Sequence, residues 1–372
     1  MSNARKLADN LPTEGSLSGR NVIVNGAMQV AQRGTSSTMT STGYTNVDRF
    51  SINRDFPTGV TSISTSQDSD APSGFANSLK IKPDQARTAA LASADRLFLN
   101  HVIEAQNLQH LDYNTSSAKT ITLSFFIKSN LTGVVSVEIS ADDSTDSNYQ
   151  YYHESVTINA ANTWEYKTVS IAGNVNNPIN DDNGGGIGLT WVLAAGPVFT
   201  SGTFGTGSWH DTTAGDRASS SNIDIYSSAS NYVKLTGVQL EIGPQATPFE
   251  HEPISVTLSK CQRYFYQPVN NTASGERHGF MEASSYNGSA STYGVFQFPV
   301  PMRVPPTYSV GNLSQFRMRF GADTTPASTG LHGSATTNTC MPIWAGPSGF
   351  TAGRHGWIET KDNGKVEFDA EL

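Results

Sequence analysis

The sequence has few charged residues and almost no cysteine. Asp, Glu, Lys and Arg make up 15% of the 372 residues, and the only cysteines are Cys261 and Cys340. Two cysteines cannot build a disulfide framework, and these two lack the spacing of a metal-ligand pair, so we expect two buried free thiols. The formal net charge of -8 provides no basic surplus for phosphate groups, which argues against nucleic acid as a partner.

Long hydrophobic runs and catalytic motifs are also missing. No apolar stretch is long enough to span a bilayer, and segment 1–19 is too polar for a signal peptide, so we expect a protein made in a cytoplasm without membrane insertion. There is no G-x-S-x-G elbow, phosphate-binding loop, H-E-x-x-H or C-x-x-C pair. The sequence therefore predicts neither an enzyme nor a cofactor.

Short segments of alternating apolar and polar residues are abundant. In segment 120–129 the apolar members of the alternation are Ile121, Leu123, Phe125 and Ile127. The same alternation recurs in segments 134–139, 151–158, 164–171, 187–194 and 222–226. A period of two is typical of strands with one buried face, and Gly, Asn and Ser turns separate the segments. We therefore predict an all-β fold, an antiparallel jelly-roll-like sandwich.

The stretch 234–266 marks a domain junction. Its strand-like alternation ends at Gly243-Pro244, and between Ser255 and Tyr266 the apolar spacing changes to that of a short helix. We predict an N-terminal docking arm over 1–20, the sandwich over 21–250, and a linker helix with a smaller C-terminal β domain over 251–372.

Two local signals refine this division. Ser2 is suited to cap a short helix that ends near Asn10 in the arm. In the C-terminal domain, Asn363-Gly364 is typical of a tight turn and predicts a hairpin over 357–368.

Motifs at both ends of the predicted sandwich resemble those of a virion protein family. The opening motif reads NVIVNGAMQVAQRGT from Asn21 and is followed by Asp48-Arg49-Phe50; the closing motifs are QLEIG, TPFE and CQRYFYQ. In this order they resemble phage tail fibre and other virion proteins with a carbohydrate-binding-module-like jelly-roll domain. Phe50 stands where that family usually has Trp.

The resemblance implies a structural subunit of a tailed-phage virion, in first place a tail fibre or tail-tip protein that binds a host surface glycan. It further implies a homotrimer, which would cover exposed strand edges, attached to other tail proteins through the N-terminal arm and located in the virion tail. Two alternatives stay open. One is a capsid or baseplate protein without a ligand of its own, and the other is a virion-associated depolymerase.

The charged residues of the opening motif allow two interpretations. Arg33, Asp48 and Arg49 stand in otherwise neutral sequence. They would form either a glycan clamp or a buried Asp–Arg pair that ties the first strands together, and the second use is commoner for a motif of this kind.

Two regions carry candidate ligand-binding residues. Trp209 follows a Gly-Thr-Gly turn in a long polar loop, where its ring could stack on a sugar. The C-terminal candidates are basic and aromatic: Arg317, Arg319, Trp344, Arg354, His355 and Trp357. Arginine together with aromatic rings suits an anionic glycan. In the alternative, the tryptophans fill cores and the arginines are solvated.

Overall fold

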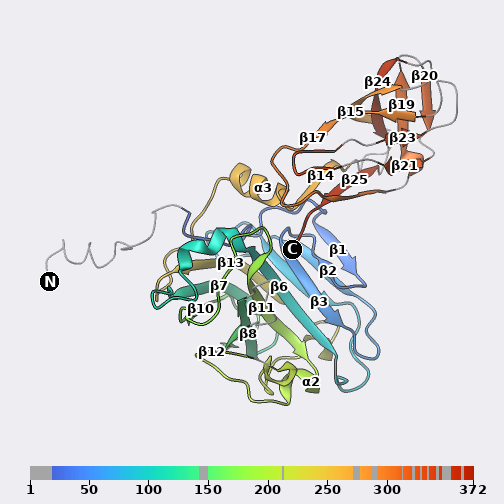
Figure 1. Ribbon diagram of the computed structural model, residues 1–372. Helices are drawn as coiled ribbons and strands as arrows, with labels where there is room; N and C mark the ends of the chain where they lie inside the picture. Colours follow the sequence, from blue (N-terminus) through green and yellow to red (C-terminus); the bar gives the residue numbers. More distant parts are fainter. Residues whose placement is uncertain are drawn as a thin grey trace. The chain divides into compact units, whose positions relative to one another are not determined.

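Strands dominate the chain in the computed structural model (Figure 1). The structure describes residues 19–141, 150–211, 213–270, 277–285, 291–311, 313–320, 323–326, 329–332, 335–340, 343–345, 353–361 and 364–372. The predicted arm helix lies outside these residues. The chain divides into two compact units, the first ending at Thr257 and including Leu372, and the second comprising Leu258–Glu371. Within the described ranges, no helix has the length and apolar character needed to cross a membrane.

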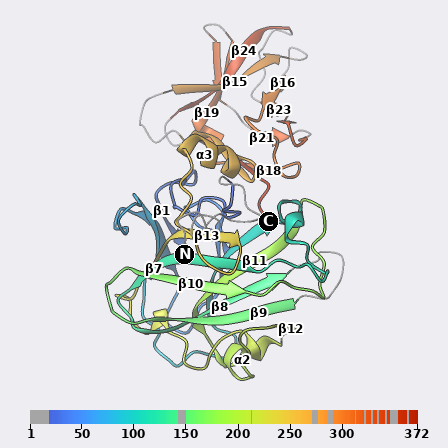
Figure 2. The ribbon, with the colours of Figure 1, turned by 90° about the vertical axis from the view of Figure 1, so that its left-hand side faces the viewer.

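The first unit consists of two antiparallel sheets (Figures 1 and 2). The six-stranded sheet has the order β1 (Ser36–Met39), β4 (Ile63–Asp68), β5 (Ser78–Pro83), β13 (Val233–Ile242), β7 (Ile121–Ser129), β10 (Glu165–Ile171). The seven-stranded sheet has the order β12 (Trp209–Asp211), β9 (Gln150–Ile158), β8 (Gly133–Ala141), β11 (Gly185–Ala195), β6 (Arg96–Glu104), β3 (Phe50–Asp55), β2 (Gly43–Tyr44). Consecutive strands often belong to opposite sheets, so the chain crosses between them repeatedly. The predicted antiparallel jelly-roll-like sandwich is confirmed.

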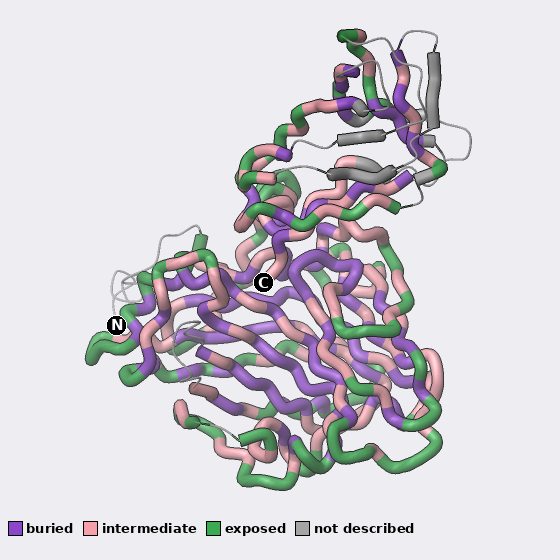
Figure 3. Tube along the Cα trace, turned by 45° about the vertical axis from the view of Figure 1, so that its right-hand side comes forward, coloured by how far each residue is buried: buried purple, intermediate pink, exposed green. Residues whose placement is uncertain are grey.

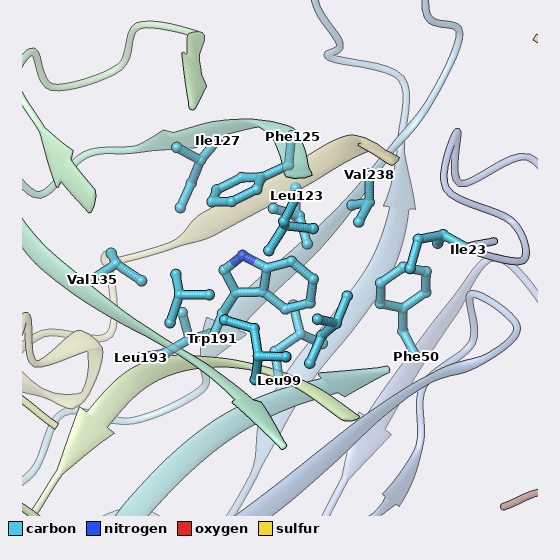
Figure 4. Close-up of a cluster of buried hydrophobic side chains, with 14 of the residues drawn as sticks. Ile23, Phe50, Leu99, Leu123, Phe125, Ile127, Val135, Trp191, Leu193 and Val238 are labelled. Carbon is cyan, nitrogen blue, oxygen red and sulfur yellow. The ribbon is translucent and has the colours of Figure 1, made fainter. Parts of the chain in front are cut away.

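The core of this unit lies between the sheets, where the inward-facing residues of both sheets meet. Trp191 is 1% exposed, and its ring meets the ring of Phe125 edge to face at 5.5 Å between centroids (Figure 4). In Figure 3 the buried stretches follow the strands and the exposed stretches follow the loops. Trp164, in contrast, precedes β10 and donates from its indole nitrogen to Asp70 at 3.1 Å.

Short helical turns connect several strands. They are η1 (Ala105–Leu111), α2 (Pro197–Thr200), η2 (Ala214–Asp216) and η3 (Ile225–Ser227). The strand predicted over 222–226 is wrong, because this segment ends in the turn η3. The carboxylate of Asp224 accepts a hydrogen bond from the backbone of Tyr226 at 2.9 Å, and this local bond favours a turn over an extended strand.

The closing motifs bind distant parts of the first unit to one another. On β13, the carboxylate of Glu241 accepts from the backbone of Thr247 at 2.8 Å, and the side-chain oxygen of Gln239 accepts from the backbone of Glu250, also at 2.8 Å. The carboxylate of Glu250 in turn accepts from the backbone of Asn21 at 2.9 Å. We call Asn21, Gln239, Glu241 and Glu250 the terminal clasp, because they join the two ends of the sandwich.

The opening motif is also structural. Asp48 is buried, lies 4.0 Å from Arg33 and accepts from the backbone of Gln32 at 2.9 Å. Arg49, only 1% exposed, donates to the carbonyl of Val102 at 2.7 Å. These contacts confirm the interpretation as a buried Asp–Arg pair that ties the first strands to the sheet.

The second unit is smaller and also built from strands. The chain enters it through helix α3 (Ile254–Gln262), which agrees with the predicted helix.

One sheet contains β14 (Phe265–Asn270), β25 (Lys365–Asp369) and β18 (Thr307–Val310). A seven-stranded sheet contains β20 (Asp323–Pro326), β19 (Phe316–Phe320), β24 (His355–Lys361), β15 (Arg277–Ser285), β16 (Ser291–Tyr293), β23 (Ile343–Ala345) and β21 (Thr329–His332). The pair β17 (Phe296–Gln297) and β22 (Thr339–Cys340) completes it. Both cysteines are free and buried, as predicted.

The hairpin predicted over 357–368 is wrong. Strands β24 and β25 belong to different sheets, and β25 pairs with β14 and β18. This pairing places Val366 and Phe368 in the core of the unit, where both are 0% exposed. Burial of these two side chains outweighs the pairing of β24 with β25 that the local pattern predicted.

The buried His101 should make the stability of the first unit pH-dependent. It is 1% exposed on β6, and burial together with the charge of Arg49 holds its pKa well below the usual 6.5. The unfolded chain binds a proton below about pH 6.5 and the folded chain does not, so stability falls as the pH drops through that range and is unaffected above it.

We therefore expect His101→Leu to reduce the pH slope of the unfolding free energy by up to about 1.4 kcal/mol per pH unit below pH 6.5. Urea unfolding at several pH values measures this slope. Leu99→Val, on the same strand and inward-facing, removes core volume but no titrating group, so it should lower stability equally at every pH. An unchanged slope in His101→Leu would contradict the prediction.

The terminal clasp should contribute measurably to stability. Glu241 is 3% exposed and is bonded to both the backbone and the hydroxyl of Thr247. Hydrogen bonds to a charged acceptor contribute about 1.5–3 kcal/mol, so Glu241→Ala should lower the unfolding free energy by about that amount. Thr168→Ala, at an exposed position of β10, is the control and should change it by less than about 0.5 kcal/mol. Equal effects of the two substitutions would show that the clasp is not stabilising.

Candidate ligand-binding site

Trp209 is placed by packing within the first unit. It lies on the edge strand β12, where its ring is half-buried against Tyr113 and Tyr152, with centroids at 6.0 and 5.6 Å. Its indole nitrogen donates to the carbonyl of Ala172 at 2.6 Å. The ring and the nitrogen are therefore both engaged with the protein, and the ring packs against the core of the first unit.

The C-terminal candidates come together on one sheet of the second unit, where Figure 1 shows β19, β24 and β15. Trp357 on β24 stands directly opposite Arg319 on β19 and opposite Glu282 on β15. His355, two residues earlier, stands opposite Ser284. Because side chains alternate along a strand, these residues share one face of the sheet.

The other face of the same strands forms the core. Ile358 and Met318 are 0% exposed, and Met281 is 7% exposed. Since the apolar members of the alternation are buried, the polar and aromatic members must face outward. Alternation thus places Trp357 and its neighbours on the outer face.

Trp357 is held in place by charged neighbours and remains open to solvent. Trp357 is 42% exposed, and the guanidinium of Arg319 lies over its ring, 5.6 Å from the ring centroid. Arg319 also lies 3.7 Å from the carboxylate of Glu359, which accepts from the indole nitrogen at 3.4 Å. These contacts restrict the indole without covering it, and a restricted aromatic surface loses little entropy when a ligand stacks on it.

A groove of about 760 Å³ lies beside this indole. Its lining residues come from β15, β16, β24 and the residues after β16: Glu282, Ala283, Ser284, Tyr293, Gly294, Val295, His355, Gly356 and Trp357. The imidazole of His355 is hydrogen-bonded to the hydroxyl of Ser284 at 2.8 Å. Val295 is 68% exposed, so the groove combines two exposed apolar side chains with several polar ones.

Two glycines allow the strands to meet at this groove. A methyl group on Gly356 would collide with the carbonyl of Arg319, and one on Gly294 would collide with the carbonyl of Glu282. Both positions therefore require glycine for close approach of the backbones, not for an unusual backbone angle.

Arg317 and Arg354 lie outside the groove lining, and the side chain of Trp344 is outside the described residues. Arg354 donates to the carbonyl of Phe320 at 2.9 Å, and Arg317 stands opposite Glu359 in the register of β19 and β24. Trp344 belongs to β23, but its side chain lies outside the described residues. Of the predicted residues, the structure thus brings together Arg319, His355 and Trp357.

Sequence reasoning missed the other half of the groove. Glu282, Ser284, Tyr293 and Val295 carry no motif and occur about sixty to seventy-five residues before Trp357. Their proximity therefore follows only from the pairing of β15 with β24 and β16. Alternation within 279–285 places Glu282 and Ser284 on one face of a strand. It does not show which face of that strand is buried. Among the described residues, no group of three or more His, Cys, Asp or Glu side chains is placed to hold a metal ion.

Comparison with known proteins gives only distant structural likenesses. No family model and no curated protein matches the sequence. The structure is similar to a putative sugar binding protein from Bacteroides thetaiotaomicron, with 14% identity and a TM-score of 0.33 over 60% of this chain and 100% of the other. It is also similar to a xylan-binding domain from Paenibacillus barcinonensis, with 12% identity and a TM-score of 0.29 over 59% and 98%.

A phage protein occurs among these likenesses. The enzymatically active domain of tailspike protein 4 from bacteriophage CBA120 has 12% identity and a TM-score of 0.29, over 60% of this chain and 22% of that one. This chain therefore spans less than a quarter of the tailspike chain. Likenesses this distant identify neither a family nor a function.

The two tryptophans should respond differently to truncation. Trp209→Ala removes a ring that packs against the core and should lower the unfolding free energy of the first unit by about 3 kcal/mol. Trp357→Ala removes a solvent-open ring and should lower that of the second unit by less than about 1 kcal/mol. Denaturant unfolding of each variant, with circular dichroism to verify the fold, measures both. A larger loss for Trp357→Ala would place its ring in the scaffold.

Proposed function

We propose that the protein is a structural subunit of a tailed-phage virion, a tail fibre or tail-tip protein, and that it binds a host surface glycan in the groove of its second unit. The observation that carries the glycan-binding part is the indole of Trp357, open to solvent at 42% and restricted by Arg319 and Glu359 beside a groove of about 760 Å³. An aromatic face surrounded by hydroxyl, imidazole and carboxylate groups is suited to the apolar face and hydroxyl rim of a sugar ring.

The virion part of the proposal is supported by the order of the sequence motifs. The terminal clasp and the buried Arg33–Asp48 pair give those motifs a structural role, so they support membership of the fold rather than a ligand site. We further propose that the subunit is a homotrimer in the virion tail, attached to other tail proteins through its N-terminal arm. A role as a capsid or baseplate protein without a ligand remains the second candidate, but the exposed Trp357 beside a groove favours a binding protein.

We propose a binding role rather than a catalytic one. The described part of the groove lining contains one carboxylate, that of Glu282, whereas the usual glycosidase mechanism requires two carboxyl groups that flank the scissile bond. Glu359 is 3% exposed and engaged with Arg319 and Trp357. The carboxyl group of Glu359 therefore holds the indole in place and is not proposed as a second catalytic group.

Loss of the Trp357 ring should weaken glycan binding without affecting assembly. The full-length chain is applied to an array of bacterial surface polysaccharides, and host cells are incubated with the same protein. We expect wild type to bind, and Trp357→Ala to lose about 1–3 kcal/mol of binding free energy, the loss expected for one stacked aromatic ring at a central contact.

The matched control is Tyr166→Ala, which removes an exposed aromatic ring from the first unit, where Tyr166 is 46% exposed. It should bind as wild type does. Light scattering of all three proteins reports the oligomeric state. Wild-type binding by Trp357→Ala, or an equal loss in Tyr166→Ala, would contradict the assignment of the groove, and a protein absent from purified particles would contradict the virion role.

A further inference from the structure

The charge of the groove differs from the charge of its surroundings. Three arginines belong to the neighbouring sequence, but neither arginine nor lysine occurs among the described lining residues. Of the lining residues that the structure describes, only Glu282 carries a carboxylate, and it is exposed. Wherever a cleft is lined by one sign of charge, the potential inside it repels ligands of the same sign. The groove itself therefore disfavours anions.

Two of the three arginines, Arg319 and Arg354, are engaged within the protein, and the third, Arg317, stands opposite Glu359, two residues along β24 from Trp357. The charge of Arg319 is matched by Glu359 at 3.7 Å, and its guanidinium lies over the Trp357 ring. Arg354 donates to the carbonyl of Phe320 at 2.9 Å. Both side chains are used to hold the protein together, so the arginine-rich sequence around Trp357 is misleading as an indicator of an anionic ligand.

The position of Glu282 fits recognition of hydroxyl groups. It stands directly opposite Trp357 in the pairing of β15 with β24, and directly opposite residues on one face have Cβ atoms about 4.5–5.5 Å apart. A sugar ring that covers the indole would therefore bring its hydroxyl rim near the carboxylate. An ionised carboxylate accepts hydrogen bonds at both oxygens and donates none, so it suits two neighbouring hydroxyl groups.

We propose that Glu282 determines the specificity of the groove, and that the groove takes an uncharged sugar whose neighbouring hydroxyls donate to this carboxylate, while sugars with acidic groups bind more weakly. This inference rests on the proposed glycan-binding function and specifies the ligand class. It also replaces the anionic glycan that the sequence suggested with an uncharged one.

The test compares sugars that differ in charge. The full-length protein is titrated by calorimetry with tetrasaccharides of glucose, galactose and mannose, and with tetrasaccharides of glucuronic and galacturonic acid. We expect the best neutral ligand to bind at least about tenfold more tightly than the acidic sugar of the same configuration, with a smaller difference at high salt, because salt screens the repulsion.

Two substitutions at Glu282 sharpen the result. Glu282→Gln keeps the size but removes the charge, so it should weaken the neutral ligand by about tenfold and narrow the gap to the acidic one. Glu282→Lys should reverse the order of preference. Glu367→Gln, on β25 and outside the groove lining, makes the same change of net charge and should leave both affinities unchanged.

The outcomes separate the two proposals. Binding of acidic sugars by wild type as tightly as neutral ones, or unchanged affinities in Glu282→Gln, overturns the role of Glu282 while leaving glycan binding intact. No binding of any sugar by wild type, here and on the polysaccharide array, overturns both. Circular dichroism of Glu282→Lys verifies its fold, and Glu282→Gln decides the matter on its own if the lysine variant does not fold.

Discussion

Ile358 is completely buried, and because of this its neighbours along β24 must face away from the core of the second unit. The strands on either side follow the same rule, since Met318 and Met281 are buried at matching positions of β19 and β15. The outer face of the sheet is therefore composed of the residues between these apolar ones. The position of Trp357 beside Arg319 and Glu282 depends on that single constraint.

The first unit obeys the same alternation but uses buried polar contacts at its ends. The terminal clasp gives Glu241 and Glu250 backbone partners, and the opening motif gives Asp48 and Arg49 theirs. A buried charged group is costly unless hydrogen bonds satisfy it, so such residues tolerate few replacements. This explains why the most recognisable motifs of the sequence are structural, whereas the groove residues belong to no motif.

Exposure separates tryptophans that look alike in sequence. Trp191 is 1% exposed and fills the sandwich core, Trp209 is half-buried with its nitrogen bonded to Ala172, and Trp357 is 42% exposed. Each lies in an alternating segment or closely follows a glycine. The local sequence pattern therefore does not distinguish a buried tryptophan from an exposed one. The sequence also does not show which arginines are available to a ligand. Arg319 and Arg354 are conspicuous in the sequence, but in the structure Arg319 pairs with Glu359 and Arg354 donates to the carbonyl of Phe320.

By itself the sequence determined the fold class, most strands of the sandwich, the helix near residue 255 and the buried state of both cysteines, because each follows from local periodicity or composition. It also indicated Arg319, His355 and Trp357 as members of one group, because basic and aromatic residues recur within segment 317–357. Only the tertiary structure decided that Val366 and Phe368 leave the expected hairpin for a different sheet, and that Glu282, Ser284 and Tyr293 face His355 and Trp357. Strand pairing between distant segments makes these choices, and the free energy gained by burying side chains in a shared core is not visible in either segment alone.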